Sequence, residues 1–341
     1  MNLIELRNLH VSSNSRLSLA PVSLISLAFS LLIYGSFTIA ADIEPWKLKN
    51  TEQLLNRIGT ATKLPLEMSE IDLQLTNFDG EIGVVSSVAV GNDGLFYLLQ
   101  RNIEVDPVIV INNDGEILRT WGKGLYAIPH SIRIDPDGNV WTVDAGNSQI
   151  YKFSPEGKEL LHIDVGEIPE IKSRFKGTAD IAFASDGNVL IADGYGNARV
   201  LEYDQKGQRI REWGSAGTGP SEFKIAHAIT IDDNDIIYVG DRENGRIQRF
   251  DRNGKFLGIW DGLGRVFSLF FDGELIWAGI TRLDLPGGSG GFVMQINRES
   301  GDVVGIVSAP AVHSVTVTKT GEFLSGLRPN RVIWFQHIQD K

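Results

Sequence analysis

A repeat of about 45 residues is the feature that most constrains the fold of this chain of 341 residues. Each copy contains a short alternating apolar strand, a polar turn, a second strand that ends in aspartate in the clearest copies, a loop with asparagine and a third strand. The clearest copies begin at His130 ("HSIRIDPDGNVWTVD"), Ala179 ("ADIAFASDGNVLIAD") and His227 ("HAITIDDNDIIYVGD"). Alternating strands joined by such turns predict antiparallel hairpins.

Weaker copies begin at Ser86, Phe267 and His313, so the repeat has six equivalent start positions. Their mean spacing is (313 − 86)/5, or about 45 residues, which is the size of a four-stranded propeller blade. A solenoid is the alternative, but its ends need polar capping repeats, which the sequence does not show. We therefore predict an all-β, six-bladed β-propeller over residues 75–341, with a leader segment over residues 41–74.

Residues 1–40 have the layout of an export signal. Two arginines precede an apolar run that begins at Leu17 and ends in small residues near Ala40. We expect cleavage after Ala40 and a secreted or periplasmic protein. The alternative is a membrane anchor formed by residues 17–40, because the run is long enough to span a bilayer.

Charge and cysteine content exclude several classes of function. The formal net charge is -11, which argues against nucleic acid or another polyanion as partner. The chain has no cysteine. Stability must therefore come from the core rather than from disulfides, and no thiolate can serve as a nucleophile or metal ligand.

Histidines occupy the second, fourth and sixth start positions, namely His130, His227 and His313. In a six-bladed ring these blades lie about 120° apart, and the first strand of each blade lines the channel. Three imidazoles would then converge on the axis, which is the arrangement that zinc needs in order to keep a fourth position open. The alternatives are ordinary polar residues at strand starts, or another divalent ion that imidazole binds well.

A second set of candidates lies where the second strand of each blade ends. This strand ends 14 residues after the start position and must return to the same rim. The next residues are Arg101 in the first blade and Arg242 in the fourth, and the corresponding turn of the third blade carries Gly194 and Tyr195. Guanidinium groups can bind a carboxylate and lower the pKa of a nearby phenol, which could then act as a general base. The alternatives are a salt bridge from Arg242 to Asp241 or Glu243, and a packed aromatic role for Tyr195.

Aspartates recur at the ends of the second strands, at Asp144, Asp193 and Asp241. Each is followed within a few residues by asparagine. We expect these carboxylates to make structural hydrogen bonds between blades rather than to take part in catalysis.

The motifs "PHSIRIDPDGNVWTVD", "DGYGNARV" and "DRENGRIQRF" resemble the peptidyl-alpha-hydroxyglycine alpha-amidating lyases, six-bladed propellers related to the NHL-repeat proteins. The resemblance covers residues 84–335. It implies zinc bound by His130, His227 and His313, catalysis by Tyr195, and substrate binding by Arg101 and Arg242. The reaction it implies is cleavage of a C–N bond to give an amide and glyoxylate, from a small or peptide substrate with a carboxylate that a separate monooxygenase would supply.

The resemblance also implies a structural calcium ion in the channel. Two of its ligands would be the backbone carbonyls of Val88 and Ile132. The third would be an aspartate directly after the last histidine, but this chain has Ser314 there. Loss of a carboxylate weakens a calcium site.

Two other functions remain open at this point. One is a non-catalytic NHL-type binding module, which would need no alternating histidines. The other is a metal-dependent hydrolase similar to the lactonases on other six-bladed propellers, whose calcium sites use Glu, Asn and Asp where this chain has histidine. Metal content separates the binding module from both enzymes, and release of glyoxylate separates the lyase from the hydrolase.

Overall fold

The computed structural model describes residues 43–285, 290–310 and 312–338. The predicted export signal or anchor over residues 1–40 lies outside the described residues. Within the described part, no helix combines the length and the apolar character needed to cross a bilayer.

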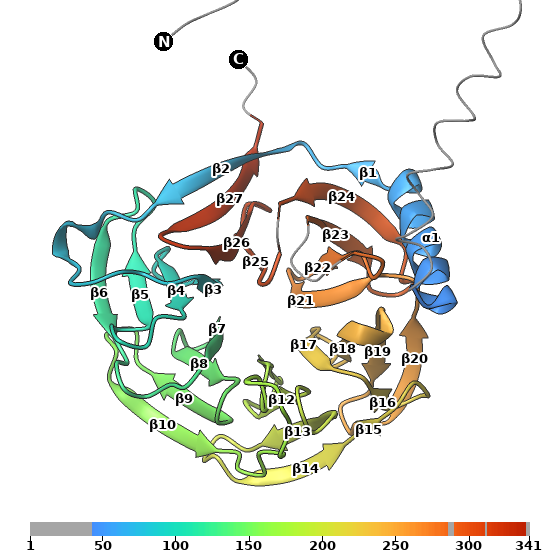
Figure 1. Cartoon of the computed structure of the whole chain (residues 1–341), viewed down its shortest axis with the longest axis horizontal. Coiled ribbons are helices and arrows are strands. Elements are labelled where there is room, and N and C mark those ends of the chain that lie inside the picture. The colour runs from blue at the N-terminus through green and yellow to red at the C-terminus, as the bar shows by residue number, and fades with distance from the viewer. Residues whose placement is uncertain (1–42, 286–289, 311, 339–341) are drawn as a thin grey trace, which may run out of the picture. The chain divides into compact units, whose positions relative to one another are not determined.

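Six β-sheets stand around a ring, so the predicted six-bladed β-propeller is confirmed (Figure 1). In the first four blades the strands follow one another from the channel outward. Their bounds in blades one and two are β3 (Val85–Val90), β4 (Phe96–Gln100), β5 (Val108–Ile111), β6 (Ile117–Trp121), β7 (Pro129–Ile134), β8 (Val140–Asp144), β9 (Gln149–Phe153) and β10 (Glu159–Asp164). In blades three and four they are β11 (Asp180–Phe183), β12 (Val189–Asp193), β13 (Arg199–Tyr203), β14 (Arg209–Trp213), β17 (Ala226–Ile231), β18 (Ile237–Asp241), β19 (Arg246–Phe250) and β20 (Phe256–Trp260).

The last two blades each take one strand from the segment before residue 75. Blade five consists of β21 (Arg265–Phe271), β22 (Leu275–Thr281), β23 (Gly291–Asn297), β24 (Val303–Ala309) and the added parallel strand β1 (Thr62–Lys63). Blade six consists of β25 (Thr316–Val317), β26 (Phe323–Arg328), β27 (Arg331–His337) and β2 (Leu66–Asp72). Because β2 pairs with the whole of β27, the start and the end of the ring share one sheet (Figure 1). The ring therefore begins before residue 75, and β2 covers an edge that would otherwise be unpaired.

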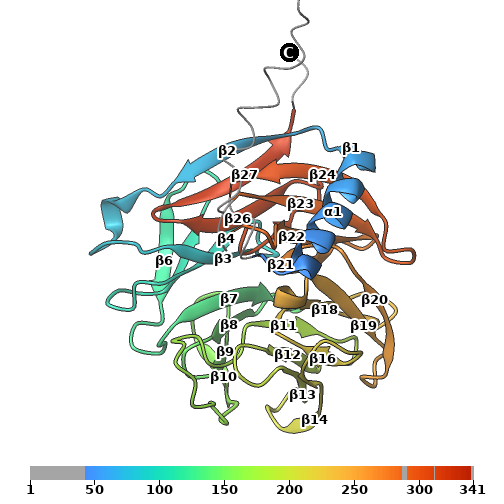
Figure 2. The ribbon, with the colours of Figure 1, turned by 45° about the vertical axis from the view of Figure 1, so that its right-hand side comes forward.

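The segment before β1 is the helix α1 (Pro45–Thr60), which the repeat did not predict. It lies along the outside of blade five (Figures 1 and 2). Its Leu54 is fully buried in the apolar cluster between blades four and five. The remaining short elements are the two-stranded pair β15 (Ser215–Ala216) and β16 (Glu222–Phe223), and the 3-10 turns η2 (Leu75–Asn77) and η3 (Arg242–Asn244).

Buried apolar side chains form six clusters in the described residues, one between each pair of neighbouring blades. The cluster between blades two and three, for example, joins Val143 and Ile150 to Ile191 and Leu201. Alternation along each strand produces this pattern, because successive side chains point to opposite faces of the sheet and each face meets a neighbouring blade. The polar channel is therefore built on rigid, well-packed walls.

Candidate metal centre in the channel

A β-bulge sets the orientation of the start residues in four of the blades. The register of β7 with β8 shifts between Pro129 and Ser131, so that His130 has no partner residue on β8. In blade four the register of β17 with β18 shifts in the same way and leaves His227 without a partner residue. A bulged residue leaves the pairing ladder, so its side chain can be directed away from the regular alternation. The repeat located these positions, but the bulges are visible only in the structure.

The three predicted histidines converge in the channel. Their candidate ligand nitrogens lie within 4.8 Å of one another, and His130, His227 and His313 are 2%, 1% and 9% exposed. This is the only group of three or more such ligand side chains found in the described residues.

Each histidine donates its Nδ1 proton to the start residue of the following blade. The acceptors are the carbonyl oxygens of Ala179 for His130 (2.7 Å), Phe267 for His227 (2.9 Å) and Ser86 for His313 (2.8 Å). A carbonyl oxygen can only accept, so the proton is on Nδ1 and the lone pair is on Nε2. Backbone carbonyls thus fix all three imidazoles in the tautomer that ligates a metal through Nε2.

Burial keeps the three rings neutral. It lowers the pKa of His130 and of His227 well below the usual value, with help from neighbouring positive groups. Burial, and next the charge of Arg101, lower the pKa of His313 to about 3. At neutral pH the three Nε2 atoms are therefore available as ligands without first losing a proton.

The rim residues reach the same three nitrogens. The Tyr195 hydroxyl lies 2.9 Å from Nε2 of His130 and 2.9 Å from Nε2 of His227, and Arg101 donates from Nη2 to Nε2 of His313 at 3.2 Å. A hydroxyl has one hydrogen, so one of the two Nε2 acceptors beside Tyr195 has no proton to accept. A metal ion bound by all three Nε2 atoms would satisfy every lone pair. The donor set therefore fits zinc or another divalent ion that imidazole binds well.

The expected lowering of the Tyr195 pKa is wrong for the protein alone. Burial raises the pKa of the Tyr195 phenol, and the charges of Arg242 and Arg101 counteract only part of that increase. The physical reason is that the phenolate loses its hydration in the enclosed site.

The two rim arginines differ in how their charge is balanced. Arg242 donates from Nε to Glu243 at 3.0 Å, and Glu243 also accepts from Arg265 at 3.1 Å. The salt-bridge alternative thus holds for Glu243 rather than for Asp241. Among the described residues Arg101 makes no ion pair, its Nε is buried without a partner, and burial lowers its pKa. Arg101 is therefore the guanidinium with uncompensated charge.

Phe175 also belongs to this site, although the sequence did not single it out. Its ring stacks on Tyr195 with centroids 5.1 Å apart, and the guanidinium of Arg101 lies 5.4 Å from its centroid. Phe175 lies between β10 and β11, outside the repeated strands. The repeat therefore gives no information about Phe175. The only signal in the sequence is the longer connection between blades two and three.

The recurring aspartates hold the rim loops in place. Asp241 accepts from the backbone N–H of Lys224 at 2.8 Å and from the side chains of Asn244 at 2.7 Å and Arg246 at 2.8 Å. Asp144 accepts the N–H groups of the residues that lead into β7. The structural role is as expected, but these bonds lie within a blade and its entry loop rather than between blades. They fix the turns from which the rim side chains project.

The pKa of His313 predicts a pH dependence of stability in the metal-free protein. The folded-state pKa of about 3 is below the unfolded value of about 6.5, so the unfolded chain binds more protons between these two pH values. The stability from this group is complete above about pH 6.5, and it is lost as the pH falls toward 3. Urea unfolding at a series of pH values should show a slope about 1.4 kcal/mol per pH unit steeper for wild type than for His313→Gln. Equal slopes for the two proteins would contradict the buried neutral histidine.

Fold and site together define a class, which is a six-bladed β-propeller with a three-histidine centre in its channel. A family model described as "6-bladed beta-propeller" matches residues 173–261. A solved structure, described as "Streptogramin B lyase structure", covers 80% of this chain and 97% of its own, with a TM-score of 0.55 and 13% identity. At that identity it supports the fold alone.

The relatives by sequence are more specific. A probable peptidyl-alpha-hydroxyglycine alpha-amidating lyase of Caenorhabditis elegans is 28% identical over an alignment of 320 residues, which covers 81% of this chain and 89% of that protein. The peptidylglycine alpha-amidating monooxygenase of Rattus norvegicus is 35% identical over an alignment of 176 residues, which covers 48% of this chain and 18% of that protein. The resemblance to the peptidyl-alpha-hydroxyglycine alpha-amidating lyase family is therefore confirmed.

Proposed function

We propose that this protein is a zinc-dependent lyase that cleaves the C–N bond of a peptidyl-alpha-hydroxyglycine-like substrate into an amide and glyoxylate. The observation that carries the proposal is the convergence of three histidine Nε2 lone pairs in the channel. Two of them lie at the Tyr195 hydroxyl, and the third accepts from the uncompensated guanidinium of Arg101. The names of the relatives support the same reaction class. A companion monooxygenase would supply the hydroxylated substrate, and export from the cytoplasm would place both enzymes together.

His130, His227 and His313 would hold the metal. When bound there, zinc supplies Lewis-acid character to an oxygen of the substrate and so lowers the pKa of its hydroxyl. The protein's own residues bind the substrate, orient it and handle the proton. The narrow, buried site also limits water, which strengthens each of these electrostatic contacts.

Tyr195 is the residue placed to handle the proton. In its phenolate form, Oη accepts the proton of the substrate hydroxyl. The C–N bond then breaks as the carbonyl group of glyoxylate forms, and the departing amide nitrogen takes that proton from the Tyr195 hydroxyl, which restores the phenolate. The reaction consumes no water and no net proton. Arg242 counteracts the effect of burial and favours the phenolate that accepts the proton, because its guanidinium lies 5.5 Å from the centroid of the Tyr195 ring with Nη1 3.5 Å from Oη.

Release of glyoxylate from an alpha-hydroxyglycine peptide by the zinc-loaded full chain tests this function. Equimolar amide and glyoxylate are the expected products. A lactone hydrolysed by the same preparation, with no glyoxylate from the peptide, would instead indicate the hydrolase. A protein that remains metal-free after incubation with zinc would indicate the binding module.

Arg101 is expected to bind the carboxylate of the substrate, because its charge is not balanced by any other group in the described site. Arg101→Met should raise KM for a substrate with a free carboxylate by about 100-fold or more, since a charged hydrogen bond contributes about 1.5–3 kcal/mol and a fork has two. For the methyl ester of the same substrate, KM should differ little between wild type and variant. An equal loss for both substrates would contradict the assignment. Arg331→Met, at an exposed ion pair, is the matched control.

A further inference from the structure

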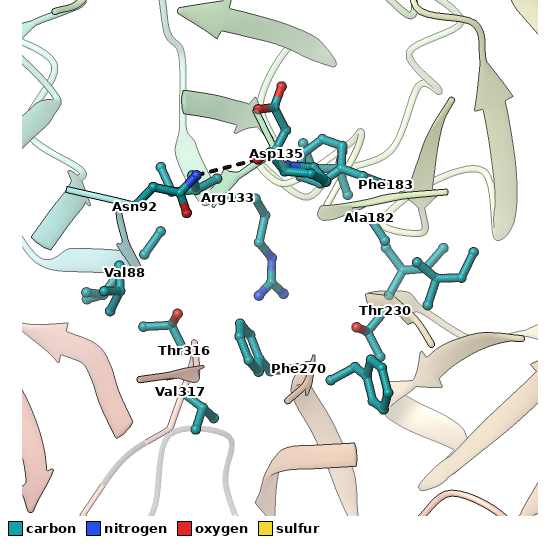
Figure 3. A pocket seen from close by; sticks show the side chains of 18 residues that line it. Val88, Asn92, Arg133, Asp135, Ala182, Phe183, Thr230, Phe270, Thr316 and Val317 are labelled. Carbon is teal, nitrogen blue, oxygen red and sulfur yellow. Dashed lines mark hydrogen bonds between the residues drawn. The ribbon is translucent and has the colours of Figure 1, made fainter. Parts of the chain in front are cut away.

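The guanidinium of Arg133 lies in the middle of the channel, on the side of the histidines away from the rim. Figure 3 shows its side chain extending from β7 into the centre of a ring that includes Val88, Ala182, Thr230 and Thr316, each from a different inner strand. This ring surrounds a pocket of about 330 Å³ at the opposite mouth of the channel. The side chain of Arg133 is only 14% exposed.

Arg133 forms a two-point ion pair with Asp180. Its Nε donates to Oδ1 at 2.9 Å and its Nη2 donates to Oδ2 at 2.5 Å. The carboxylate is buried, and it also accepts from the hydroxyl of Ser131 at 2.6 Å and from the backbone N–H of Ile229 at 3.3 Å. These added bonds offset the cost of removing both charges from water.

The pair links four of the six blades. Arg133 and Ser131 are on β7 of blade two, Asp180 is on β11 of blade three, and Ile229 is on β17 of blade four. Arg133 Nη2 also donates to the carbonyl oxygen of Leu269 on β21 of blade five, at 3.1 Å. Cross-linking of separate blades through the channel is the role that a structural cation would have.

The position of Leu269 relates this pair to the calcium ion that the family resemblance implies. Val88 and Ile132, the expected carbonyl ligands, each lie two residues after a start position. Leu269 is the equivalent residue of blade five, because 267 + 2 is 269. We call the level of the channel two residues after the start positions the calcium layer. The Arg133 guanidinium therefore donates to a carbonyl oxygen of this layer.

The remaining space in this layer does not suit calcium. The cavity between the histidines and Arg133 has a volume of about 10 Å³, which is the room for about one water. Calcium takes six to eight oxygen ligands, and Ser314 lines this cavity with a hydroxyl in place of a carboxylate. The one carboxylate there, Asp180, is already paired with Arg133. The residues present therefore do not fit the ion.

We infer that Arg133 is a built-in cation that replaces a structural metal ion in the channel. Its charge is covalently attached and always present, so the ring needs no divalent ion in this layer. Because Arg133 and Ser131 lie on the strand that carries His130, their pairing with Asp180 also holds that strand in register below the three histidines. The inference concerns a layer separate from the metal centre, and it does not depend on the reaction proposed above.

Thermal unfolding of the zinc-loaded full chain, with and without added calcium, tests the inference together with elemental analysis. Wild type should contain no stoichiometric calcium, and its Tm should not change on addition of calcium. A specific structural calcium at hundredfold excess over its Kd would raise the Tm by about 5 °C. Bound calcium at one per chain, or a rise of that size, would overturn the inference.

Arg133→Met tests the structural role, with Arg331→Met as the matched control at an exposed ion pair. Removal of the guanidinium leaves Asp180 buried without its counter-ion, so the Tm should fall by several degrees, whereas the control should hardly change it. An unchanged Tm for Arg133→Met would overturn the role. If that variant does not fold, Arg133→Lys keeps the charge but loses the two-point hydrogen bonding to Asp180. Its Tm should then lie below that of wild type. A Tm equal to that of wild type would again overturn it.

Discussion

Replacement of His227 by alanine is expected to abolish metal binding and with it the activity. His227 is 1% exposed, and its Nε2 is one of the three imidazole lone pairs that converge in the channel among the described residues. Two imidazoles at the bottom of a buried site cannot complete the coordination that zinc requires. The purified wild type should contain about one zinc per chain, and His227→Ala about none, as measured by elemental analysis.

His162→Ala is the matched control for this variant. His162 is on β10, is exposed, and makes its contact with Gln149 outside the channel. It should therefore keep its zinc and its activity. Zinc retained in His227→Ala at the wild-type level would contradict the three-histidine centre. A melting curve of the variant separates loss of metal from loss of fold.

Replacement of Tyr195 by phenylalanine is expected to lower kcat by about 100-fold to 10,000-fold, the range in which a positioned general acid or base contributes. The aromatic ring remains, so its stacking on Phe175 and its contact with Arg242 should persist. Only the hydroxyl that lies 2.9 Å from two histidine nitrogens is lost. Zinc content should not change, because Tyr195 is not needed as a ligand.

The combination of unchanged zinc and reduced kcat is what distinguishes proton transfer from a structural role. Tyr203→Phe is a suitable control, since Tyr203 is on β13 in the apolar cluster between blades two and three. Wild-type kcat in Tyr195→Phe would remove the residue from the proposed mechanism. A loss of zinc in that variant would instead assign the hydroxyl to the metal site.

The sequence alone was sufficient to predict the fold and the positions of the central residues. Successive copies of the repeat are related by rotation about the channel axis. Equivalent positions in alternate blades must therefore converge on this axis. His130, His227 and His313 followed from that symmetry. Hairpin geometry located Arg101, Tyr195 and Arg242 in the same way, because a returning strand must end at the rim from which the first strand began.

Properties that depend on balance between neighbours could not be predicted in this way. The arginines were expected to lower the pKa of Tyr195, but burial of the phenol has the larger effect and raises it. Arg101 and Arg242 look equivalent in the repeat, yet only Arg242 has a carboxylate partner, Glu243. The desolvation of an ionisable side chain and its ion pairs depend on all the atoms that surround it. The repeat does not encode these surroundings.

The sequence by itself thus determined a six-bladed ring with three histidines on its axis, because periodicity is a local pattern that symmetry converts into geometry. Only the tertiary structure decided which segment closes the ring, which side chain covers Tyr195 and what occupies the channel below the histidines. Pairing of β2 with β27, stacking of Phe175 on Tyr195 and the bond between Arg133 and Asp180 each join parts of the chain outside the repeat or in different blades. Such contacts have no period, and they exist only once the blades have packed into a ring.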